Sequence, residues 1–258
     1  MNLEVLISCM HNDNFDIIDS LNLKNVNALI VNQCDCERES LEVKVNDEIK
    51  HRKINTPSRG LSVSRNIAID NAEGDFVLLC DDDERLDDNL TQIILGAYKS
   101  HPWADIICFR VNAPQKKMMK KEHLLNYVTA LKIASWQISF KLDSIKKAGI
   151  RFDIKFGSPF NSGEENIFLY DCLKRHMKIV YIPITIGKLS PGVSQWFKGY
   201  NEEFFFNQGK KMKRLMGKFG GTLYCFAYAL RKRNRYKGEI ETKKAILWMW
   251  KGINDECI

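Results

Sequence analysis

Short apolar runs alternate with longer mixed stretches through the first half of the chain. The runs Leu3–Cys9, Asn27–Cys34 and Phe76–Cys80 have the length and composition of buried strands. A stretch of helical length separates the first two runs, and this order is typical of a βαβ unit. A further extended segment is predicted near 48–56. It leads directly into a helix predicted within 60–75.

The helix within 60–75 has its own start and stop signals. Ser62 or Ser64 is suited to cap its beginning, and Gly74 to end it. Beyond it the pattern predicts a helix at Asp88–Ser100, a strand at Ala104–Val111, a basic loop at 114–121, a helix at His123–Ala134, a strand at Trp136–Phe140, a short helix from Asp143, a long helix from about Gly163, a strand at Lys178–Pro183 and helices from Ser194 onward.

This order of strands and helices predicts an α/β fold. We expect a mostly parallel central sheet in three layers, followed by a helical C-terminal extension. Sheets of this kind bind ligands outside the carboxyl ends of their strands. We divide the chain into an α/β domain at 1–195, with halves at 1–110 and 111–195, and a basic, aromatic helical extension at 196–258.

The composition is that of a globular protein. The chain has 258 residues, 45% of them hydrophobic, which is enough for one large core. No apolar run reaches the roughly 18 residues of a membrane span, and the first residues lack the features of a signal peptide. The eight cysteines are scattered, which favours reduced thiols, and Cys34 and Cys36 are too close for the usual zinc-ligand spacing. We therefore expect a globular, cytoplasmic protein without a zinc site.

Asp81, Asp82, Asp83 and Glu84 follow directly on the third apolar run. In an extended chain Asp81 and Asp83 point to one side of a strand and Asp82 to the other. Such carboxylates suit Mg²⁺ or Mn²⁺, which commonly bind one or two carboxylates together with substrate phosphates. Capping of the next helix is the competing interpretation. It accounts for the aspartates at 87–88 but does not require four further acids.

The stretch GLSVSRNIAIDNAEGDFVLLCDDDERL (60–86) combines a Gly-x-Ser-x-x-Arg-Asn helix, a Gly-Asp turn, an apolar strand and an Asp-x-Asp motif. It resembles family 2 glycosyltransferases with the GT-A fold, and a weaker likeness extends from Leu3 to about Phe206. The resemblance implies an inverting, metal-dependent hexosyltransferase. Such an enzyme moves a sugar from a nucleotide diphosphate to an acceptor hydroxyl, with Mn²⁺ or Mg²⁺ on the donor diphosphate. It also implies that 1–110 binds the nucleotide sugar and 111–195 the acceptor.

The resemblance assigns roles to single residues. Asp83 stands at the position of the metal ligand, and Asp81 at that of a contact with the ribose or the metal shell. Arg65 corresponds to an arginine that helps to hold the nucleotide, whereas a surface arginine on a helix is the alternative interpretation. The implied substrate-binding set also includes Ser8, Cys9, Asn32, Asp82 and Lys188. Many members carry aspartate where this chain has an asparagine at the second strand's end. An asparagine at this place leaves the base identity open, although an amide can still hydrogen-bond uracil. A UDP-sugar is the expected donor.

A second acidic pair, Glu164 and Glu165, stands at the start of the predicted long helix. Inversion needs a base that takes a proton from the acceptor hydroxyl. The family usually has Glu-Asp here with the second acid as the base, so the resemblance implies Glu165 first and Glu164 second. A capping box formed by Ser162 and Glu165 is the alternative. Farther on, Lys188 lies near the place of a metal-binding histidine of many members; it either neutralises diphosphate or leaves the metal to Asp83 and water.

The C-terminal extension is basic and aromatic. Residues 198–258 hold 14 Lys/Arg against 6 Asp/Glu, whereas the rest of the chain holds 25 against 26. Three interpretations stay open: an amphipathic helix pair that covers the sheet, a segment lying on an anionic membrane surface, and a nucleic-acid-binding segment, which we do not expect. A membrane role would suit the acceptor that the resemblance implies, a saccharide or lipid-linked oligosaccharide in capsule or cell-surface polysaccharide synthesis. The protein would then be peripheral on the inner face of the cell membrane.

Two other classes of protein compete with a glycosyltransferase. Nucleotidyltransferases also use an α/β sheet with acidic metal ligands, but they usually carry a glycine-rich phosphate loop after the first strand. The segment SCMHNDNFD at 8–16 has no glycine, which argues against this class. A non-catalytic membrane- or nucleic-acid-binding module on a degenerate transferase fold is the second alternative. Asn32, Glu165 and Lys188 depart from the family's pattern and keep that alternative open.

Overall fold

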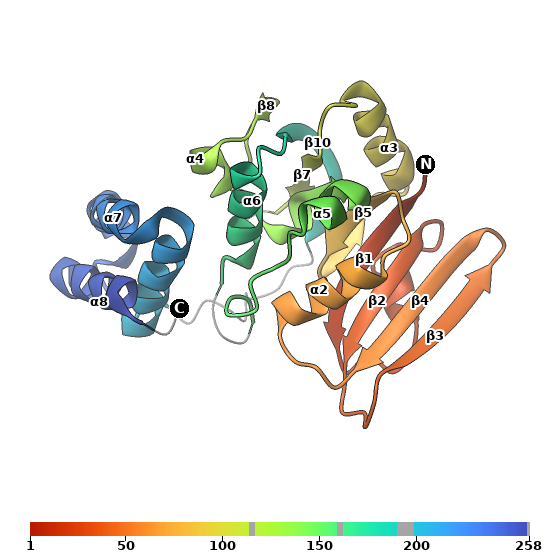
Figure 1. The fold of residues 1–258 in the computed structure, drawn as a ribbon, viewed down its shortest axis with the longest axis horizontal. Helices are drawn as coiled ribbons and strands as arrows, with labels where there is room; N and C mark the ends of the chain where they lie inside the picture. Colours follow the sequence, from red (N-terminus) through yellow and green to blue (C-terminus); the bar gives the residue numbers. More distant parts are fainter. Residues whose placement is uncertain (114–116, 159–161, 190–198, 257–258) are drawn as a thin grey trace.

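A ten-stranded sheet forms the centre of the described molecule (Figure 1). The computed structural model describes residues 1–113, 117–158, 162–189 and 199–256. The strands are β1 Leu3–Met10, β2 Asn27–Gln33, β3 Ser40–Asn46, β4 Ile49–Thr56, β5 Phe76–Cys80, β6 Glu84–Leu86, β7 Ile106–Asn112, β8 His123–Leu124, β9 Ile138–Lys141 and β10 Ile179–Leu189. Their order in the sheet is β3-β4-β2-β1-β5-β9-β7-β10-β6, and β8 pairs with β10 outside this path.

The sheet is mixed. Strands β4, β2, β1 and β5 run parallel to one another, and β7 runs parallel to β10. Strand β9 lies antiparallel between β5 and β7, and β3 forms an antiparallel hairpin with β4. The expected α/β class is confirmed. The sheet is less parallel than predicted because the hairpin and the inserted strand β9 add antiparallel pairs that the alternation of strands and helices does not reveal.

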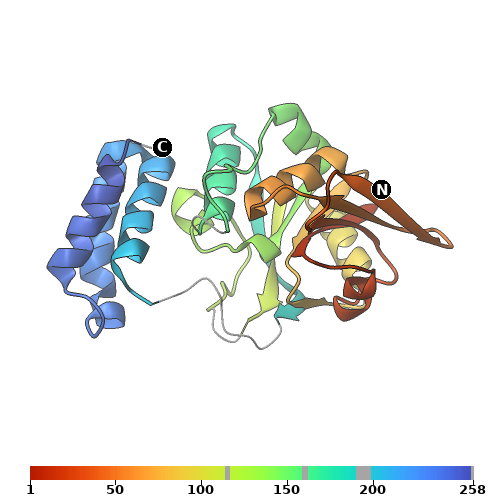
Figure 2. The ribbon, with the colours of Figure 1, turned by 90° about the horizontal axis from the view of Figure 1, so that it is seen from below.

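Helices cover both faces of the sheet (Figure 2). They are α1 Asp16–Ser20, α2 Leu61–Asn71, α3 Leu90–Ser100, α4 Tyr127–Ala130, α5 Leu142–Ala148, α6 Glu164–Lys174, α7 Glu202–Tyr236 and α8 Thr242–Asn254, with a 3₁₀ turn at Ser135–Gln137. One hydrophobic cluster joins α1 and α3 to Leu78 of β5, and another joins α2, α5 and α6 to Leu79. Strand β5 is therefore buried on both sides, which explains its unbroken apolar run.

The C-terminal helices form a bundle beside the sheet (Figures 1 and 2). Helix α7 is broken at Gly217, where φ is 72°, into a first arm (202–216) and a second arm (218–236). The bundle packs against α6 through α7. The expected helical extension is confirmed, although its predicted start at 196 lies outside the described residues. Among the described residues, no helix combines the length and the apolar character needed to cross a membrane.

Close backbone contacts hold the bundle together. A methyl group added at Gly209 would lie 2.1 Å from the carbonyl oxygen of Met249, and one at Gly252 would lie 2.0 Å from that of Phe206. Any side chain at either glycine would force α8 away from the first arm of α7. Buried bundle residues such as Met212 belong to the same hydrophobic cluster as the residues under α2 and α6, so the bundle and the sheet share one core.

Three predicted elements differ from the structure. The strand expected at Trp136–Phe140 is a 3₁₀ turn through Gln137 and a strand from Ile138 to Lys141. The helix expected at His123–Ala134 is wrong: the segment instead holds β8, paired with β10, and the short α4, whose N-cap Asn126 accepts hydrogen bonds from two backbone N–H groups. The strand expected to end at Pro183 runs on to Leu189. A register shift against β7 surrounds this proline, which has no N–H to give to a ladder.

Candidate active site

The acidic run lies at the carboxyl end of β5, in the middle of the sheet. Asp81 follows directly on β5, Asp82 and Asp83 form a turn, and Glu84 begins β6. The prediction that Asp81 and Asp83 share one side of an extended strand is therefore wrong, because the chain turns at Asp82. The side chains of Asp82 and Asp83 reach the surface. Partial desolvation at the turn, together with the charge of Asp81, raises the pKa of both carboxyls.

Arg65 joins this acidic turn to the second acidic pair. Its Nη2 donates to Asp81 Oδ1 at 2.8 Å and its Nη1 donates to Glu164 Oε1 at 2.8 Å, and the arginine side chain is only 3% exposed. Ser135 Oγ donates to the other oxygen of Asp81 at 3.1 Å. The ring of Phe152 lies 5.4 Å from the guanidinium carbon. The alternative of a surface arginine is wrong, because Arg65 is a buried bridge between two acids 83 positions apart.

Local contacts of α2 hold Arg65 in this place. The helix begins after Gly60, whose φ of 113° favours glycine, so the expected cap by Ser62 or Ser64 is wrong. Ser62 Oγ instead donates to the carbonyl oxygen of Phe156 at 2.5 Å. Ser64 Oγ donates to Ser8 Oγ at 2.9 Å and fastens the helix to the end of β1. The two serines of the motif thus link the arginine's helix to both sides of the site.

Glu84 supports the acidic turn from inside. Its Oε1 accepts a hydrogen bond from the backbone N–H of Asp81 at 2.7 Å. Its Oε2 is buried and has no hydrogen-bond partner in the described part of the chain. Burial, followed by the charge of Asp81, raises the pKa of Glu84 well above its usual range. Glu84 therefore supports the turn from a buried position, through its hydrogen bond to the Asp81 backbone. The sequence pattern could not separate this buried acid from its exposed neighbours.

The second acidic pair divides into two environments. Helix α6 begins at Glu164 after Gly163, and no side chain caps it, so the capping box of Ser162 with Glu165 does not form. Glu164 is buried; Arg65 holds its Oε1, and its Oε2 accepts from the N–H of Gly163 at 3.1 Å. Glu165 is partly exposed and forms no salt bridge within the described ranges. Burial and the neighbouring charge of Glu164 raise the pKa of Glu165 to about 7.

A lysine from the C-terminal bundle reaches the same place. Lys211, on the first arm of α7, passes over the backbone of Gly163: a methyl group there would lie 2.3 Å from Lys211 Cδ and 3.1 Å from its Nζ. Burial lowers the pKa of Lys211, and the charges of Glu165 and Glu164 oppose that shift. The sequence pattern missed this residue, because nothing in the basic composition of α7 distinguishes Lys211 from the lysines around it.

The residues expected at the nucleotide base lie at the ends of β1 and β2. Ser8, Cys9 and Asn32 are all buried. Burial raises the pKa of the Cys9 thiol to about 12, so it remains protonated. Asn32 Oδ1 accepts from the N–H of Asn12 at 2.9 Å, while its Nδ2 donates to the carbonyl of Asn12 and to Asn55 Oδ1, both at 2.8 Å. Asn32 thus fixes the loop that follows β1.

Lys188 lies inside β10, not beyond the end of a strand as its predicted surroundings implied. The side chain is exposed, and the residue pairs in register with Arg85 of β6, while Leu189 pairs with Glu84. Because β10 extends this far, Lys188 stands next to Leu189, whose partner Glu84 is the first residue after the acidic turn. Across the described residues, no group of three or more His, Cys, Asp or Glu side chains is arranged to hold a metal by itself.

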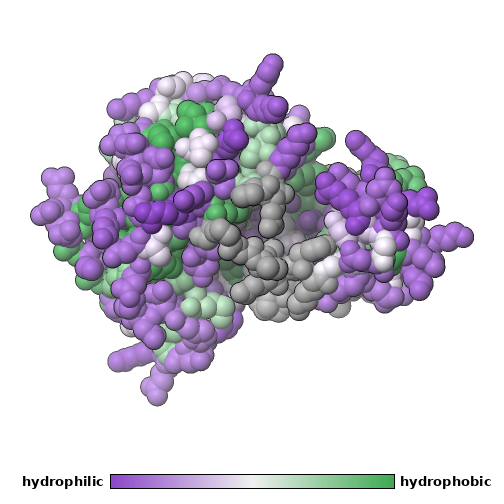
Figure 3. Space-filling view, turned by 180° about the vertical axis from the view of Figure 1, so that it is seen from behind, coloured by the Kyte–Doolittle hydropathy of each residue, from purple (hydrophilic) through white to green (hydrophobic). Residues whose placement is uncertain are grey.

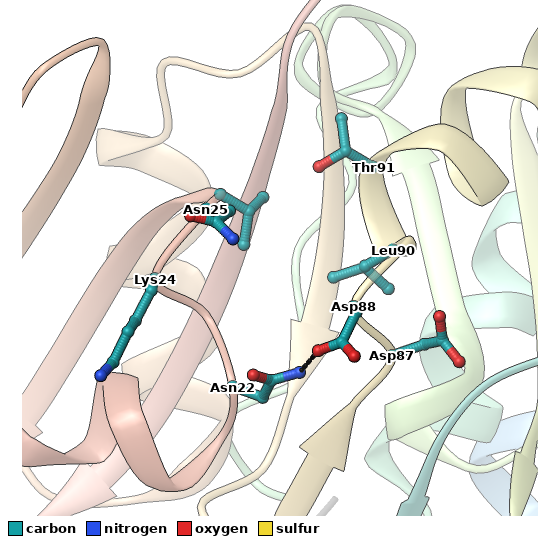
Figure 4. Close-up of a pocket in the computed structure, with 8 residues that line it drawn as sticks. Asn22, Lys24, Asn25, Asp87, Asp88, Leu90 and Thr91 are labelled. Carbon is teal, nitrogen blue, oxygen red and sulfur yellow. Dashed lines mark hydrogen bonds between the residues drawn. The ribbon is translucent and has the colours of Figure 1, made fainter.

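A small pocket near the start of α3 does not belong to this site (Figure 4). Asn22 Nδ2 donates to Asp88 Oδ1 at 2.7 Å across it, and Asp87 Oδ1 accepts from the N–H of Asn89 at 2.9 Å. No side chain caps α3: Asp88 links this turn to Asn22, and Asp87 bonds within its own turn. The pocket measures about 30 Å³, and none of the predicted substrate-binding residues lines it.

Comparison with known proteins agrees with this geometry. The family model for glycosyl transferase family 2 matches residues 16–168, more than half of the chain. The chain therefore belongs to glycosyl transferase family 2, and the enzyme class is that of a glycosyltransferase. The matched range includes the helix of Arg65, the acidic turn and both acids at the start of α6. No protein of curated function matches the chain.

Solved structures of the S. aureus protein TarS share the fold. The structure of TarS 1–349 aligns with a TM-score of 0.62 at 12% identity, covering 98% of this chain and 81% of that one. Its complex with UDP-GlcNAc gives 0.65 at 12% identity, with 97% and 78% covered, and the complex with UDP gives 0.62 at 12%, with 96% and 78% covered. This likeness confirms the expected GT-A fold with a helical C-terminal region.

Proposed function

We propose that this protein is an inverting, metal-dependent glycosyltransferase that moves a sugar from a nucleotide diphosphate, preferably UDP, to an acceptor hydroxyl. The observation that carries the proposal is the double ion pair of Arg65, which joins the acidic turn after β5 to the acidic start of α6. The acidic turn is suited to a donor diphosphate, and the acids of α6 are suited to accept a proton. These two groups therefore lie on either side of the buried Arg65 side chain.

The acidic turn is the proposed donor site. Asp82 and Asp83 fit a cation held by one or two carboxylates and by the donor phosphates, since both side chains reach the surface beside Asp81. Partial desolvation, followed by the charge of Asp81, raises the pKa of both carboxyls. Mn²⁺ or Mg²⁺ bound there would stabilise the negative charge of the departing diphosphate. We assign Asp83 as the ligand. Asp81, whose two oxygens already accept from Arg65 and Ser135, would contact the ribose or the metal shell.

The uridine part of the donor rests on two arguments. TarS structures with UDP-GlcNAc and with UDP have the same fold as this chain. Asn32 holds the loop after β1 through the backbone of Asn12, and Ser8 accepts a hydrogen bond from Ser64 of α2, so hydrogen bonds within the chain position the residues proposed to contact the uracil. Lys188, exposed beside β6, would neutralise part of the diphosphate.

Glu165 is the proposed base. Glu164 is held by Arg65, whereas Glu165 is partly exposed at the helix start and has a pKa of about 7, the range in which a general base works best. The acceptor hydroxyl would give its proton to the Glu165 carboxylate while its oxygen attacks the anomeric carbon. The bond from that carbon to the diphosphate breaks on the opposite face. A saccharide or lipid-linked oligosaccharide in cell-surface polysaccharide synthesis stays the predicted acceptor.

The stereochemistry of donor hydrolysis tests this proposal without knowledge of the acceptor. Purified protein is incubated with a panel of α-linked UDP-sugars and Mn²⁺, and proton NMR follows the anomeric signal of the released sugar before mutarotation. The β anomer should appear first, and Asp83→Asn should slow its release. Release of the α anomer would contradict inversion, and turnover unchanged in Asp83→Asn would contradict the donor site.

Lys211→Met is expected to move the acid limb of the pH profile of kcat/KM to higher pH. Glu165 can accept a proton only when ionised. Its pKa is raised to about 7 by burial and Glu164 and lowered by Lys211 and Arg65. Wild-type activity should therefore rise as pH increases through about 7, and loss of the lysine charge should delay that rise. The measurement is kcat/KM across pH for both proteins.

Lys99→Met is the matched control, because Lys99 is an exposed lysine in the last turn of α3. It should leave the profile in place. A Lys211→Met protein with normal thermal stability and an unshifted acid limb would show that this lysine does not act on the base, or that the base is another group.

A further inference from the structure

The second arm of α7 (218–236) carries an exposed apolar stripe. Phe219, Leu223, Phe226 and Leu230 are 80%, 58%, 47% and 66% exposed. Their spacing of four, three and four residues places them on one side of the helix, over roughly 16 Å of its length. On the face of the bundle seen in Figure 3, hydrophobic residues likewise come to the surface between hydrophilic ones. We call these four side chains the apolar stripe.

Other residues of the second arm are buried inside the bundle. Gly221, Cys225, Ala229 and Tyr236 are buried. Gly221 packs so closely on the first arm that an added methyl group would lie 3.0 Å from the carbonyl carbon of Met212. The stripe is therefore not the side by which the arm folds against its neighbours, and a partner could cover it without opening the bundle.

The charge around the stripe is of one sign. From 218 to 237, the second arm and the residue after it, the sequence contains six Lys/Arg and no Asp or Glu; the first acid beyond it is Glu239. Arg233 and Lys237, both exposed, continue the line of the stripe by the same spacing of three and four residues. An apolar stripe that ends in exposed cations is complementary to a surface with an apolar interior and a negatively charged exterior.

We propose that the apolar stripe, with Arg233 and Lys237, docks this protein on an anionic lipid surface. The phenylalanine and leucine side chains would enter the interfacial layer, and the two cations would bind lipid phosphates. The helix would then lie in the plane of the membrane, with the apolar stripe toward the lipid. Single-stranded nucleic acid fits less well, because two of the four stripe residues are leucines that offer no ring for base stacking.

This docking would fix the orientation of the proposed active site relative to the membrane. Arg214 on the first arm binds Asp153 before α6 and Asp171 on α6, each at 2.7 Å, and Lys211 passes over Gly163. The bundle is thus fastened to the helix that begins with the proposed base. A membrane bound by the second arm would be held at a fixed position relative to α6, which suits an acceptor carried by a lipid.

Vesicle co-sedimentation tests the docking independently of catalysis. The full chain is mixed with phosphatidylcholine vesicles, with or without phosphatidylglycerol, at low and high salt. We expect binding to the anionic vesicles that weakens in high salt. The double variant Phe219→Ser/Leu230→Ser should bind at least about tenfold more weakly, because burial of apolar area and attraction of cations act together. Arg233→Gln/Lys237→Gln should lose binding to anionic vesicles by a similar factor.

The matched control is Leu41→Ser/Val45→Ser, which removes two exposed apolar side chains, 58% and 64% against 80% and 66% for Phe219 and Leu230, from the edge strand β3. It should bind like the wild type. Equal binding to neutral and anionic vesicles, or no binding to either, would overturn the proposal. So would a dimer, seen by light scattering, that Phe219→Ser/Leu230→Ser dissociates, since a second copy of the chain would then cover the stripe. Donor turnover in solution should be unchanged in both stripe variants, so failure here leaves the proposed function intact.

Discussion

Glu165→Gln is expected to lower kcat by about 10²–10⁴-fold, the range typical of losing a general base. The amide has nearly the shape of the carboxylate but cannot take the acceptor's proton. Glu165 forms no salt bridge in the described chain, so its replacement breaks no ion pair. Donor affinity and thermal stability should therefore remain close to wild type. Initial rates of sugar transfer or donor hydrolysis, with donor binding measured on the same preparation, check this.

Two further variants are needed to interpret the loss of activity in Glu165→Gln. Glu48→Gln changes an exposed acid in the β3–β4 turn and should leave kcat unchanged. Glu164→Gln weakens the bridge to Arg65 and should reduce stability as well as activity. If Glu165→Gln kept full activity while Glu164→Gln lost it in a stably folded protein, the base would be Glu164.

Arg65→Met is expected to destabilise the protein by about 3–5 kcal/mol, as removal of one partner from a buried ion pair typically does. Methionine fills much of the space of the arginine but leaves Glu164, whose side chain is 7% exposed, without its cation. The acidic turn would also lose its link to α6, so donor binding should weaken. Chemical denaturation gives the free energy of unfolding, and nucleotide titration gives the loss of affinity.

The control is Arg151→Met. Arg151 pairs with Asp70 at the surface, where the two side chains are 34% and 55% exposed, so its loss should cost less than about 1 kcal/mol. The double variant Arg65→Met/Glu164→Gln should recover part of the stability, because the uncompensated charge is removed with it. Equal, small effects of Arg65→Met and Arg151→Met would mean that the bridge does not hold the site together.

The sequence predicted well those strands and helices whose own residues determine their burial. β5 was predicted at its observed bounds because Phe76–Cys80 is apolar on both sides and Asp81 ends the run. The helix of Arg65 forms at Leu61–Asn71, inside the predicted range 60–75, although neither predicted serine caps it and it ends before Gly74. The helix expected at His123–Ala134 failed because β8 exists only through its pairing with β10, a contact between residues more than fifty positions apart.

For the site as well, the sequence indicated single residues but not the contacts that the fold makes between them. The motif located Arg65, the acidic run and the acidic pair, but not their relation, because the bridge from Arg65 to Glu164 spans 99 positions. The burial of Glu84 depends on the turn that encloses it, and no pattern in the run indicates it. Lys211 reaches the site through the packing of α7 on α6, and one lysine among many in a basic helix carries no such signal.

The measurement that tests the central claim most directly is thermal stability of the purified protein with nucleoside diphosphates, each with and without Mn²⁺ or Mg²⁺. A ligand that binds only the folded state raises the unfolding temperature. The account predicts a rise with UDP that depends on the metal and is absent in Asp83→Asn. No rise with any nucleotide and metal, or an equal rise in Asp83→Asn, would contradict a donor site at the acidic turn.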